Sequence, residues 1–462
     1  MSFMYNVTIN GVCYFAEEEE LLSSLLMRHG IDFPHPCSGR GACQKCRVTV
    51  DGEEALSCQY VIRHDATVTL PRSRELTVKE FDAPSDLDGA VTVLDIGTTT
   101  LIMALVSRDG KIIKRVGATN PQTVFGADVI SRIEQCKNHS LNAVREPLIR
   151  RINEMIRAIG HPTEKMFVAA NTTMLHIFAG EDCSSIGRAP YTARFLDLTE
   201  KSGKELSIDG IERVILLPSA HAFVGADVLA GLACAEMPEE GKYSIFLDLG
   251  TNAEIVLFSN KSAICTAAAA GPCFEGSNIQ CGMSALPGAI CSFSLIGGSP
   301  SFETVGGVDP TGICATGLID LIFELLRIGE IDETGYMEDN YRIKNGVYLS
   351  PADVRQLQLA KSAVQSAIEA LMDTAGIGYG DIETLYVSGG FASKLSVTRA
   401  AAIGLIPMPL SHKCKAFNDS CLEGTAKFAM GIPMPFERAE YCDLTRSSVF
   451  SQKFIDNMTF EI

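Results

Sequence analysis

The sequence contains no tryptophan and no uninterrupted apolar run near the roughly 20 residues that a membrane-spanning helix needs. Positive charge is scarce, since 39 Lys and Arg stand against 56 Asp and Glu and the net charge is −17. Nucleic-acid binding depends on clustered cations, so this balance argues against a nucleic-acid partner. No G-x-x-x-x-G-K-[ST] motif occurs, which excludes a P-loop. The first residues lack the basic and apolar regions of a signal peptide, and we expect a cytoplasmic protein without membrane contact.

Cysteine, by contrast, is abundant, with 16 residues in a chain of 462. Disulfides are not expected, because the chain is large and shows no export signal. Most of these cysteines are scattered among apolar neighbours, where cysteine behaves as a small buried hydrophobe. So many thiols suggest a reducing and anaerobic cell.

Three cysteines are concentrated in one short stretch, Cys37-Ser38-Gly39-Arg40-Gly41-Ala42-Cys43-Gln44-Lys45-Cys46, and Cys58 follows. The spacing C-x5-C-x2-C-x11-C is a near variant of the C-x4-C-x2-C of plant-type [2Fe–2S] proteins, which have a distant fourth cysteine. The glycines fit this chemistry, because the backbone must approach the sulfides and donate N–H groups to them. Zinc is a weaker alternative, since zinc ribbons normally carry two CxxC pairs, and redox-inert thiols are the weakest. The predicted ligands of a low-potential one-electron centre are Cys37, Cys43, Cys46 and Cys58.

The sequence around this loop predicts a small α+β domain over residues 1–72. Asn10-Gly11 predicts a hairpin turn between two β-rich runs, and an apolar stripe at helical spacing follows in Leu21, Leu22, Leu25 and Leu26. Further β-rich runs come after the cysteine loop. Hairpin, helix, metal loop and strands of this length suit a β-grasp fold. Residues 73–90 are polar and acidic, and we expect a flexible linker there.

Beyond residue 90 one pattern occurs twice. Residues 91–100 and 243–252 each pass from an apolar strand into a D-x-G-T turn, and second and third β-like runs follow in both places. Glycine lets the backbone approach a ligand, the hydroxyl and successive N–H groups form an anion-binding concavity, and the aspartate can hold hydrated Mg2+. One such turn is better explained as a structural β-turn, but two in matching contexts favour phosphate binding. The predicted residues are Asp95, Gly97, Thr98, Thr99, Asp248, Gly250, Thr251 and Asn252.

A third glycine site follows a predicted strand at Ser388-Gly389-Gly390. Before it, Ser350 and Asp353 predict the capping box of a long helix. Alone, the two glycines would be explained as a tight turn. In this order, however, D-x-G-T, D-x-G-T and S-G-G resemble the two phosphate turns and the adenosine turn of actin-like ATPases. The resemblance implies an α/β fold, a duplicated ribonuclease-H-like unit that binds ATP, with lobes at residues 91–240 and 241–462.

Several longer sequence motifs indicate which family of actin-like ATPases the chain resembles. They are G-A-D-V-I-S-R-I from Gly126, N-T-T-M-L-H from Asn171, A-A-G-P-C-F-E-G from Ala269, C-G-M from Cys281, G-I-C-A-T-G-L-I-D from Gly312 and Q-L-Q-L-A-K from Gln356. Together with the N-terminal ferredoxin, they resemble the reductive activators of corrinoid-dependent enzymes. The resemblance implies that a [2Fe–2S] centre and an ATP-hydrolysing domain return cob(II)alamin on a partner corrinoid protein to cob(I)alamin. Two departures are a spacer of only about twenty residues before the ATPase, where the family usually has a further small domain, and Ala253, where the family more often has Gly.

As a hypothesis, Asp95 and Asp248 position Mg2+ and water, and Glu254 is a weaker catalytic candidate. Phosphates are then held by Thr98, Thr99, Thr251 and Asn252, and the nucleoside faces Gly389 and Gly390. We expect His176, in the string from Asn171, to be a structural histidine rather than a residue near cobalt.

Three other functions stay open. The first is an ATP-driven activator of 2-hydroxyacyl-CoA dehydratases or benzoyl-CoA reductases, which the cysteine loop argues against because those proteins share a cluster between subunits. The second is a small-molecule kinase with an appended redox domain, and the third is a non-catalytic chaperone that loads a corrinoid protein. The sequence identifies neither the carrier nor the upstream electron donor, and it leaves open whether the chain forms a homodimer.

Overall fold

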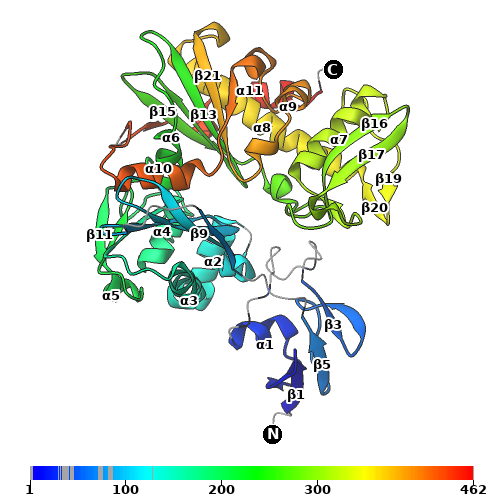
Figure 1. The fold of residues 1–462 in the computed structure, drawn as a ribbon. Helices are drawn as coiled ribbons and strands as arrows, with labels where there is room; N and C mark the ends of the chain where they lie inside the picture. Colours follow the sequence, from blue (N-terminus) through cyan, green and yellow to red (C-terminus); the bar gives the residue numbers. More distant parts are fainter. Residues whose placement is uncertain are drawn as a thin grey trace. The chain divides into compact units, whose positions relative to one another are not determined.

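The computed structural model describes residues 4–29, 31, 33, 41, 46–70, 76–81, 87–126, 128–436 and 438–460. Its contacts divide the chain into two compact units. Unit 1 comprises Met1–Pro218, Gly225–Asp227 and Thr425–Ile432, and unit 2 comprises Ser219–Val224, Val228–Gly424 and Pro433–Ile462. Both units combine sheets with helices (Figure 1), which confirms the predicted α/β class. In the described part of the chain, no helix is long and apolar enough to cross a membrane.

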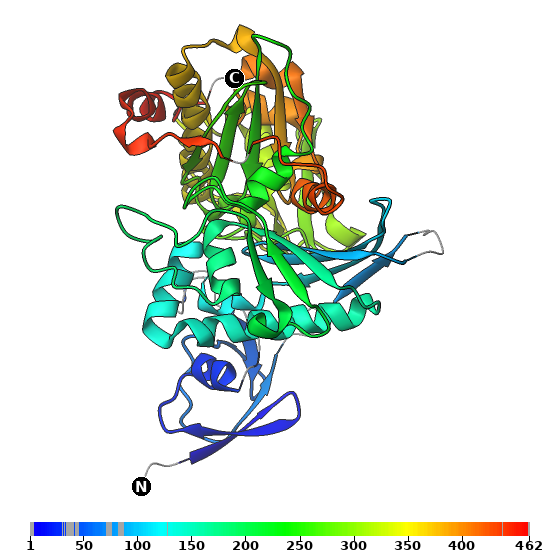
Figure 2. The same ribbon diagram turned by 90° about the vertical axis from the view of Figure 1, so that its left-hand side faces the viewer.

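The N-terminal domain is a five-stranded sheet in the order β2-β1-β5-β3-β4, with one helix. The predicted turn at Asn10-Gly11 forms, and both residues take the positive φ angles (47° and 86°) that a tight hairpin turn requires. The apolar stripe becomes helix α1, which buries Leu22, Leu25 and Leu26 (blue helix in Figure 2). The parallel pairing of β1 with β5 closes the predicted β-grasp arrangement. The bounds are β1 Met4–Ile9, β2 Val12–Glu17, α1 Leu22–Arg28, β3 Arg47–Val50, β4 Glu53–Leu56 and β5 Ala66–Thr69.

Part of the predicted flexible linker is ordered. Strand β6 (Thr77–Glu80) pairs antiparallel with β9 (Ile112–Thr119) and forms the edge of the next sheet. All four residues of β6 are exposed, so no apolar pattern in the sequence marks it as a strand. Its conformation depends on backbone hydrogen bonds to a strand far along the chain.

The large sheet of unit 1 has seven strands in the order β11-β12-β10-β7-β8-β9-β6. The first predicted meander forms, because β7, β8 and β9 pair antiparallel, while β10 lies parallel to β7. Helix α3 packs against β8 and β9. The bounds are β7 Val91–Ile96, β8 Thr100–Val106, η1 Pro121–Phe125, α2 Val129–His139, α3 Leu141–Ile159, β10 Lys165–Ala170, α4 Thr172–Ala179, β11 Thr199–Ser202, α5 Gly203–Leu206 and β12 Arg213–Leu216.

The large sheet of unit 2 repeats this plan in the order β22-β21-β13-β14-β15-β23. Strands β13, β14 and β15 form the second predicted meander, and β21 lies parallel to β13 as β10 does to β7. The predicted duplication is therefore confirmed. The bounds are α6 Ala226–Leu232, β13 Tyr243–Leu249, β14 Ala253–Phe258, β15 Ala263–Ala268, η2 Pro272–Glu275, β21 Ile382–Ser388, η5 Ala392–Lys394, α9 Val397–Ala402, η6 Met408–Lys413, β22 Cys414–Ala416, α10 Ser420–Ala429 and β23 Glu440–Tyr441.

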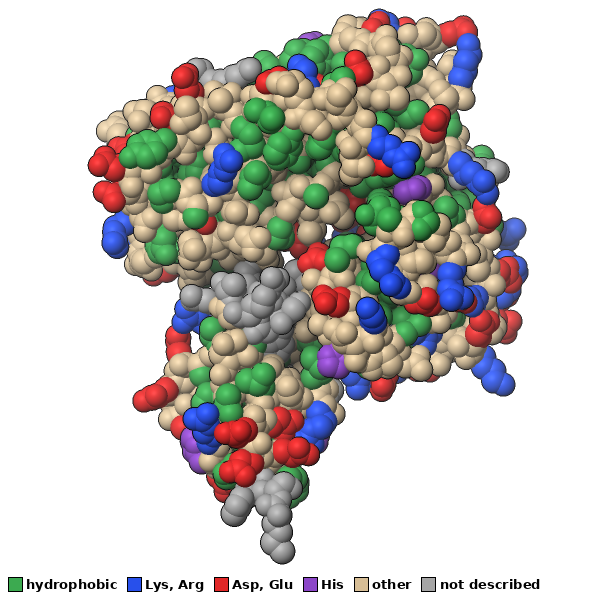
Figure 3. All heavy atoms as spheres, turned by 180° about the vertical axis from the view of Figure 1, so that it is seen from behind, with side chains coloured by type: hydrophobic (Ala, Val, Ile, Leu, Met, Phe, Trp, Pro, Cys, Tyr) green, Lys and Arg blue, Asp and Glu red, His purple; other side chains and the backbone are tan. Residues whose placement is uncertain are grey.

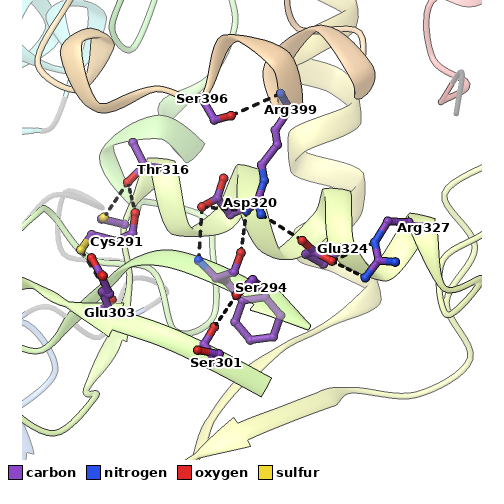
Figure 4. Close-up of polar contacts among 12 residues, drawn as sticks. Cys291, Ser294, Ser301, Glu303, Thr316, Asp320, Glu324, Arg327, Ser396 and Arg399 are labelled. Atoms are coloured by element: carbon purple, nitrogen blue, oxygen red, sulfur yellow. Dashed lines mark hydrogen bonds and ion pairs between the residues drawn. The ribbon is translucent and has the colours of Figure 1, made fainter. Parts of the chain in front are cut away.

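A smaller layer is inserted between β15 and helix α8 (Pro351–Ala375). Arg399 of α9 fixes it, since its guanidinium contacts Asp320 Oδ2 at 3.0 Å and Glu324 Oε1 at 2.9 Å, both on α7 (Figure 4). Both carboxylates are nearly buried, so this charge network holds α7 to the helix that follows the S-G-G turn. The bounds are β16 Ala289–Ile296, β17 Ser299–Thr304, η3 Val305–Gly307, β18 Gly312–Ile313, α7 Ala315–Arg327, β19 Tyr341–Lys344 and β20 Val347–Leu349, and η4 Tyr379–Asp381 follows α8.

The C-terminal segment docks on α8. The helix begins with the predicted capping box of Ser350 and Asp353 and packs against β14 and β15. Lys361, only 1% exposed, donates to the carbonyls of Asn457 at 2.7 Å and Thr459 at 2.5 Å. Gln358 and Lys361 of the string Q-L-Q-L-A-K thus hold the chain end that follows η7 (Leu444–Arg446) and α11 (Ser448–Asp456), which is a structural role. On the face shown in Figure 3, Lys and Arg side chains are interspersed with Asp and Glu.

Candidate functional site

Two of the four predicted cluster ligands lie side by side. Cys46 and Cys58 are 1% and 2% exposed, and their sulfurs are 3.2 Å apart. Two thiolates on one tetrahedral metal, each about 2.3 Å from it, have sulfurs about 3.8 Å apart, so this pair fits a shared iron after a small movement. Gly41 has a φ of +73°, where a side chain would be strained, and it packs against Gln59. Cys37 and Cys43 lie outside the described residues.

The protein environment disfavours a free thiolate at Cys58. Burial, together with the neighbouring Cys46, raises the pKa of the Cys58 thiol to about 11, while contacts from Gln59 and the Gly41 backbone act in the opposite direction. Without metal, the Cys58 thiol is therefore protonated at neutral pH. Metal binding has to displace that proton, and it compensates the burial of the resulting negative charge.

The first D-x-G-T turn joins β7 to β8. Asp95 is half-buried and lies between Ala169 of β10 and Ile102 of β8 in the sheet register. A Cβ at Gly97 would lie 2.7 Å from the carbonyl oxygen of Thr100, so the turn closes only with glycine. Two buried side chains hold this turn. Asn120 Nδ2 donates to the carbonyl of Gly97 at 2.8 Å, and Arg132 donates to the carbonyl of Thr98.

The second turn brings four predicted or neighbouring residues together. Asp248, at the end of β13, is aligned with Glu254 on β14 and with Ser388 on β21. The hydroxyl of Ser388 hydrogen-bonds to the Asp248 carboxyl, and it lies 2.6 Å from the hydroxyl of Ser420. The S-G-G turn and the second D-x-G-T turn therefore meet at one edge of the sheet.

Burial raises the pKa of Asp248 to about 6, and the hydrogen bond from Ser388 opposes this shift because it stabilises the ionised form. The residue as a whole is only half-buried, although protein atoms surround its carboxyl. A carboxyl with such a pKa is partly protonated just below neutral pH, and a bound cation would favour its ionised form. These properties suit a metal-binding or proton-accepting group.

The two glycines of the S-G-G turn differ in role. Gly389 has a φ of +114°, and a Cβ there would overlap the carbonyl oxygen of Leu249, so this glycine is needed for packing. Gly390 is exposed, and no atom of the described residues lies within 4 Å of the position where its Cβ would be. Of the two, Gly390 is the one with room for a ligand beside its backbone.

Two other residues at the second turn, Thr251 and Ala253, make contacts within unit 2. The hydroxyl of Thr251 donates to the carboxylate of Glu275, at the end of η2. Ala253 is fully buried, so the methyl group that distinguishes it from glycine packs inside the sheet. We did not single out Glu275, Ser420, Asn120 or Arg132 from the sequence. Arg132 lies in the string from Gly126 and Glu275 in the string from Ala269, and both strings resemble the reductive activators. This resemblance was the one signal in the sequence that could have identified them.

His176 is a structural histidine, as predicted. Its Nδ1 lies 2.7 Å from the carbonyl of Thr172, and its Nε2 accepts from the backbone N–H of Arg194 at 3.0 Å. The ring stacks on Phe195 and is fully buried, and burial lowers its pKa. Both ring nitrogens are therefore occupied within the protein.

Comparison with known proteins matches three successive family models. A 2Fe–2S iron–sulfur cluster binding domain matches residues 7–67, the RACo middle region matches residues 90–240, and the C-terminal domain of RACo, the ASKHA domain, matches residues 242–461. The chain belongs to the RACo family. The predicted order of a ferredoxin-like domain and an actin-like (ASKHA) ATPase fold is thereby confirmed. Boundaries after residues 72, 90 and 240 stay predictions.

Relatives of this chain with curated names include the corrinoid activation enzyme RamQ of Eubacterium limosum, which is 28% identical over 68% of this chain and 59% of that protein. The [Co(II) methylated amine-specific corrinoid protein] reductase of Methanosarcina barkeri is 25% identical over 68% of this chain and 65% of that protein. The chain thus spans less than two thirds of the length of either. A solved reductive activator for corrinoid, iron–sulfur protein has a TM-score of 0.69 and 24% identity, covering 99% of this chain and 98% of that one, which shows a shared fold.

Proposed function

We propose that this protein is an ATP-dependent reductive activator, which transfers one electron to the cob(II)alamin of a partner corrinoid protein and so regenerates cob(I)alamin. The observation that carries the proposal is the union, in one RACo family chain, of a buried cysteine pair fit for iron with a duplicated ASKHA fold. The names of these two relatives, a corrinoid activation enzyme and a Co(II) corrinoid protein reductase, support the same chemistry.

The N-terminal domain would supply the electron. Cys37, Cys43, Cys46 and Cys58 would hold the [2Fe–2S] cluster, with Cys46 and Cys58 on one iron because their sulfurs are 3.2 Å apart. When bound, such a cluster supplies one electron at a low potential, on the order of −400 mV for the plant type. An upstream electron donor of unknown identity would then reduce the cluster again.

The ASKHA domain would supply the driving force. Asp95 and Asp248 would position Mg2+ and water, and Glu254 would assist. Phosphates would lie against Thr98, Thr99, Thr251 and Asn252, with Gly97 and Gly250 shaping the turns and Gly390 beside the nucleoside. ATP need not take part in the electron-transfer step itself. Its binding or hydrolysis has to favour a conformation in which the cobalt is easier to reduce, which requires different affinities for two states.

The test is to mix the reduced protein with a cob(II)alamin-loaded carrier and to follow the Co(I) absorbance with and without ATP. We expect Co(I) to accumulate only with ATP and Mg2+. Reduction that is independent of ATP, or no reduction with any carrier, would contradict the proposal. A phosphorylated small molecule formed from ATP would indicate the kinase alternative instead.

Ser388→Ala is expected to move the acid limb of ATP turnover to higher pH by roughly one unit. The Ser388 hydrogen bond stabilises ionised Asp248, so its loss raises the pKa of Asp248 further above its usual range, and the carboxyl reaches its ionised, active form only at a higher pH. The measurement is the pH profile of phosphate release at fixed free Mg2+. Ser244→Ala is the matched control, because this buried serine lies on β13 with Asp248 and its hydroxyl has no hydrogen-bond partner among the residues that the structure describes. An unchanged profile in Ser388→Ala would contradict the role of that hydrogen bond.

A further inference from the structure

We infer that Arg132 and Asn120 are positioning residues that hold the first D-x-G-T turn ready for a nucleotide phosphate. Neither side chain has any exposed surface, yet both donate to the main chain of the turn. The inference rests on the proposed ATP function and adds to it the residues that determine ground-state phosphate affinity at this turn.

Asn120 holds two carbonyls of the turn. Its Nδ2 donates to the carbonyl of Gly97 at 2.8 Å, and its backbone N–H donates to the carbonyl of Thr99 at 2.9 Å. Its Oδ1 accepts from the backbone N–H of Gln122 at 2.9 Å and thereby caps η1. These opposite roles of Nδ2 and Oδ1 fix the orientation of the amide.

Arg132 holds the carbonyl between those two. It lies in the first turn of α2 and donates to the carbonyl of Thr98, to the carbonyl of Gly126 at 3.2 Å and towards Met174 Sδ at 3.1 Å. The guanidinium is a rigid planar donor with a permanent charge. Burying such a group costs free energy unless it is hydrogen-bonded, so an aliphatic side chain would be the simpler filling for this space. The hydrogen bond to the carbonyl of Thr98 explains why a charged side chain occupies this buried position.

The geometry of the peptide unit converts these contacts into a direction for the N–H groups. In a planar trans peptide, C=O and N–H point in opposite directions. With the carbonyls of Gly97 and Thr98 held by Asn120 and Arg132, the N–H groups of Thr98 and Thr99 point away from these two side chains. Successive N–H groups directed in this way form an anion-binding concavity, and the nearby positive charge of Arg132 favours an anion there.

The second turn is built differently. There the Thr251 hydroxyl donates to the carboxylate of Glu275, and Asp248 is the aligned acid. Both turns carry an aspartate, but a buried cation holds the main chain of the first turn, whereas a carboxylate contacts the hydroxyl of the second. We expect variants of Arg132 and Asn120 to change mainly nucleotide affinity and KM, and variants of Asp248 to change mainly kcat.

The experiment measures binding of a non-hydrolysable ATP analogue, AMPPNP with Mg2+, by calorimetry on the full-length cluster-loaded protein, alongside KM, kcat and thermal unfolding. Arg132→Met keeps the volume and removes the charge and the fork of donors, so we expect AMPPNP to bind roughly tenfold to hundredfold more weakly. Arg132→Lys restores the charge but not the fork and should recover part of the loss. Arg145→Met is the matched control, because Arg145 also donates to main-chain carbonyls in unit 1, those of Phe178 and Leu206, and it should bind AMPPNP as the wild type does.

Asn120→Asp gives a second test should Arg132→Met fail to fold. The aspartate keeps the acceptor that caps η1 but loses the donor to Gly97, and it should also weaken AMPPNP binding. Unchanged affinity in folded Arg132→Met or in Asn120→Asp, or an equal loss in Arg145→Met, would overturn the inference. A wild-type protein that binds no AMPPNP would instead overturn the proposed ATP function, so the two failures are distinguishable.

Discussion

Asp248→Asn is expected to lower ATP turnover by roughly a hundredfold or more, while the visible spectrum of the iron–sulfur centre persists. Asparagine has nearly the same shape and can still accept from Ser388, but it carries no negative charge to hold Mg2+ and cannot accept a proton. The loss should therefore appear in kcat rather than in nucleotide affinity. The measurements are phosphate release and the absorbance of the cluster in the same sample.

Glu254→Gln is the companion variant. Glu254 on β14 is aligned with Asp248 on β13. The Glu254→Gln variant therefore measures the contribution of the Glu254 carboxylate to ATP turnover separately from that of Asp248. Turnover retained in Asp248→Asn would exclude the proposed role of Asp248. If Glu254→Gln alone abolished turnover, the catalytic roles of the two acids would have to be exchanged.

Cys58→Ser is expected to abolish or strongly bleach the visible spectrum and to stop electron delivery to cob(II)alamin, while ATP turnover continues. Cys58 lies 3.2 Å from Cys46 with almost no exposed surface, so a hydroxyl there would offer a poor ligand in a site built for two thiolates. Absorbance, iron and sulfide content, and the Co(I) signal are the measurements.

Cys13→Ser provides the control for Cys58→Ser. Cys13 is an exposed cysteine of the same domain on β2, and its replacement should leave the spectrum unchanged. A Cys58→Ser protein with a normal [2Fe–2S] spectrum would contradict the ligand assignment, and zinc in place of iron in the wild type would contradict the cluster itself. With Asp248→Asn, this variant separates the electron-supplying part of the protein from the ATP-hydrolysing part.

Features that are encoded by residues close together in the chain could be predicted from the amino-acid sequence alone. Turns depend on a few neighbouring residues, so the hairpin at Asn10-Gly11, the capping box of Ser350 and Asp353 and the two D-x-G-T turns could be predicted correctly. Hydrophobic patterning fixed the paired meanders, because apolar runs of strand length between turns can be recognised locally. The cysteine spacing predicted a cluster domain for the same reason, and the family match agrees.

The distant residues that contact these turns could be identified only from the folded chain. Asn120 and Arg132 meet the first turn, and Ser388 and Ser420 meet Asp248, through contacts between elements that packing brings together. Strand β6 likewise exists because of hydrogen bonds to β9, and no apolar pattern marks it. A buried polar side chain takes its role from the partner it finds, and that partner is set by the fold as a whole, since local sequence specifies backbone conformation but not long-range pairing.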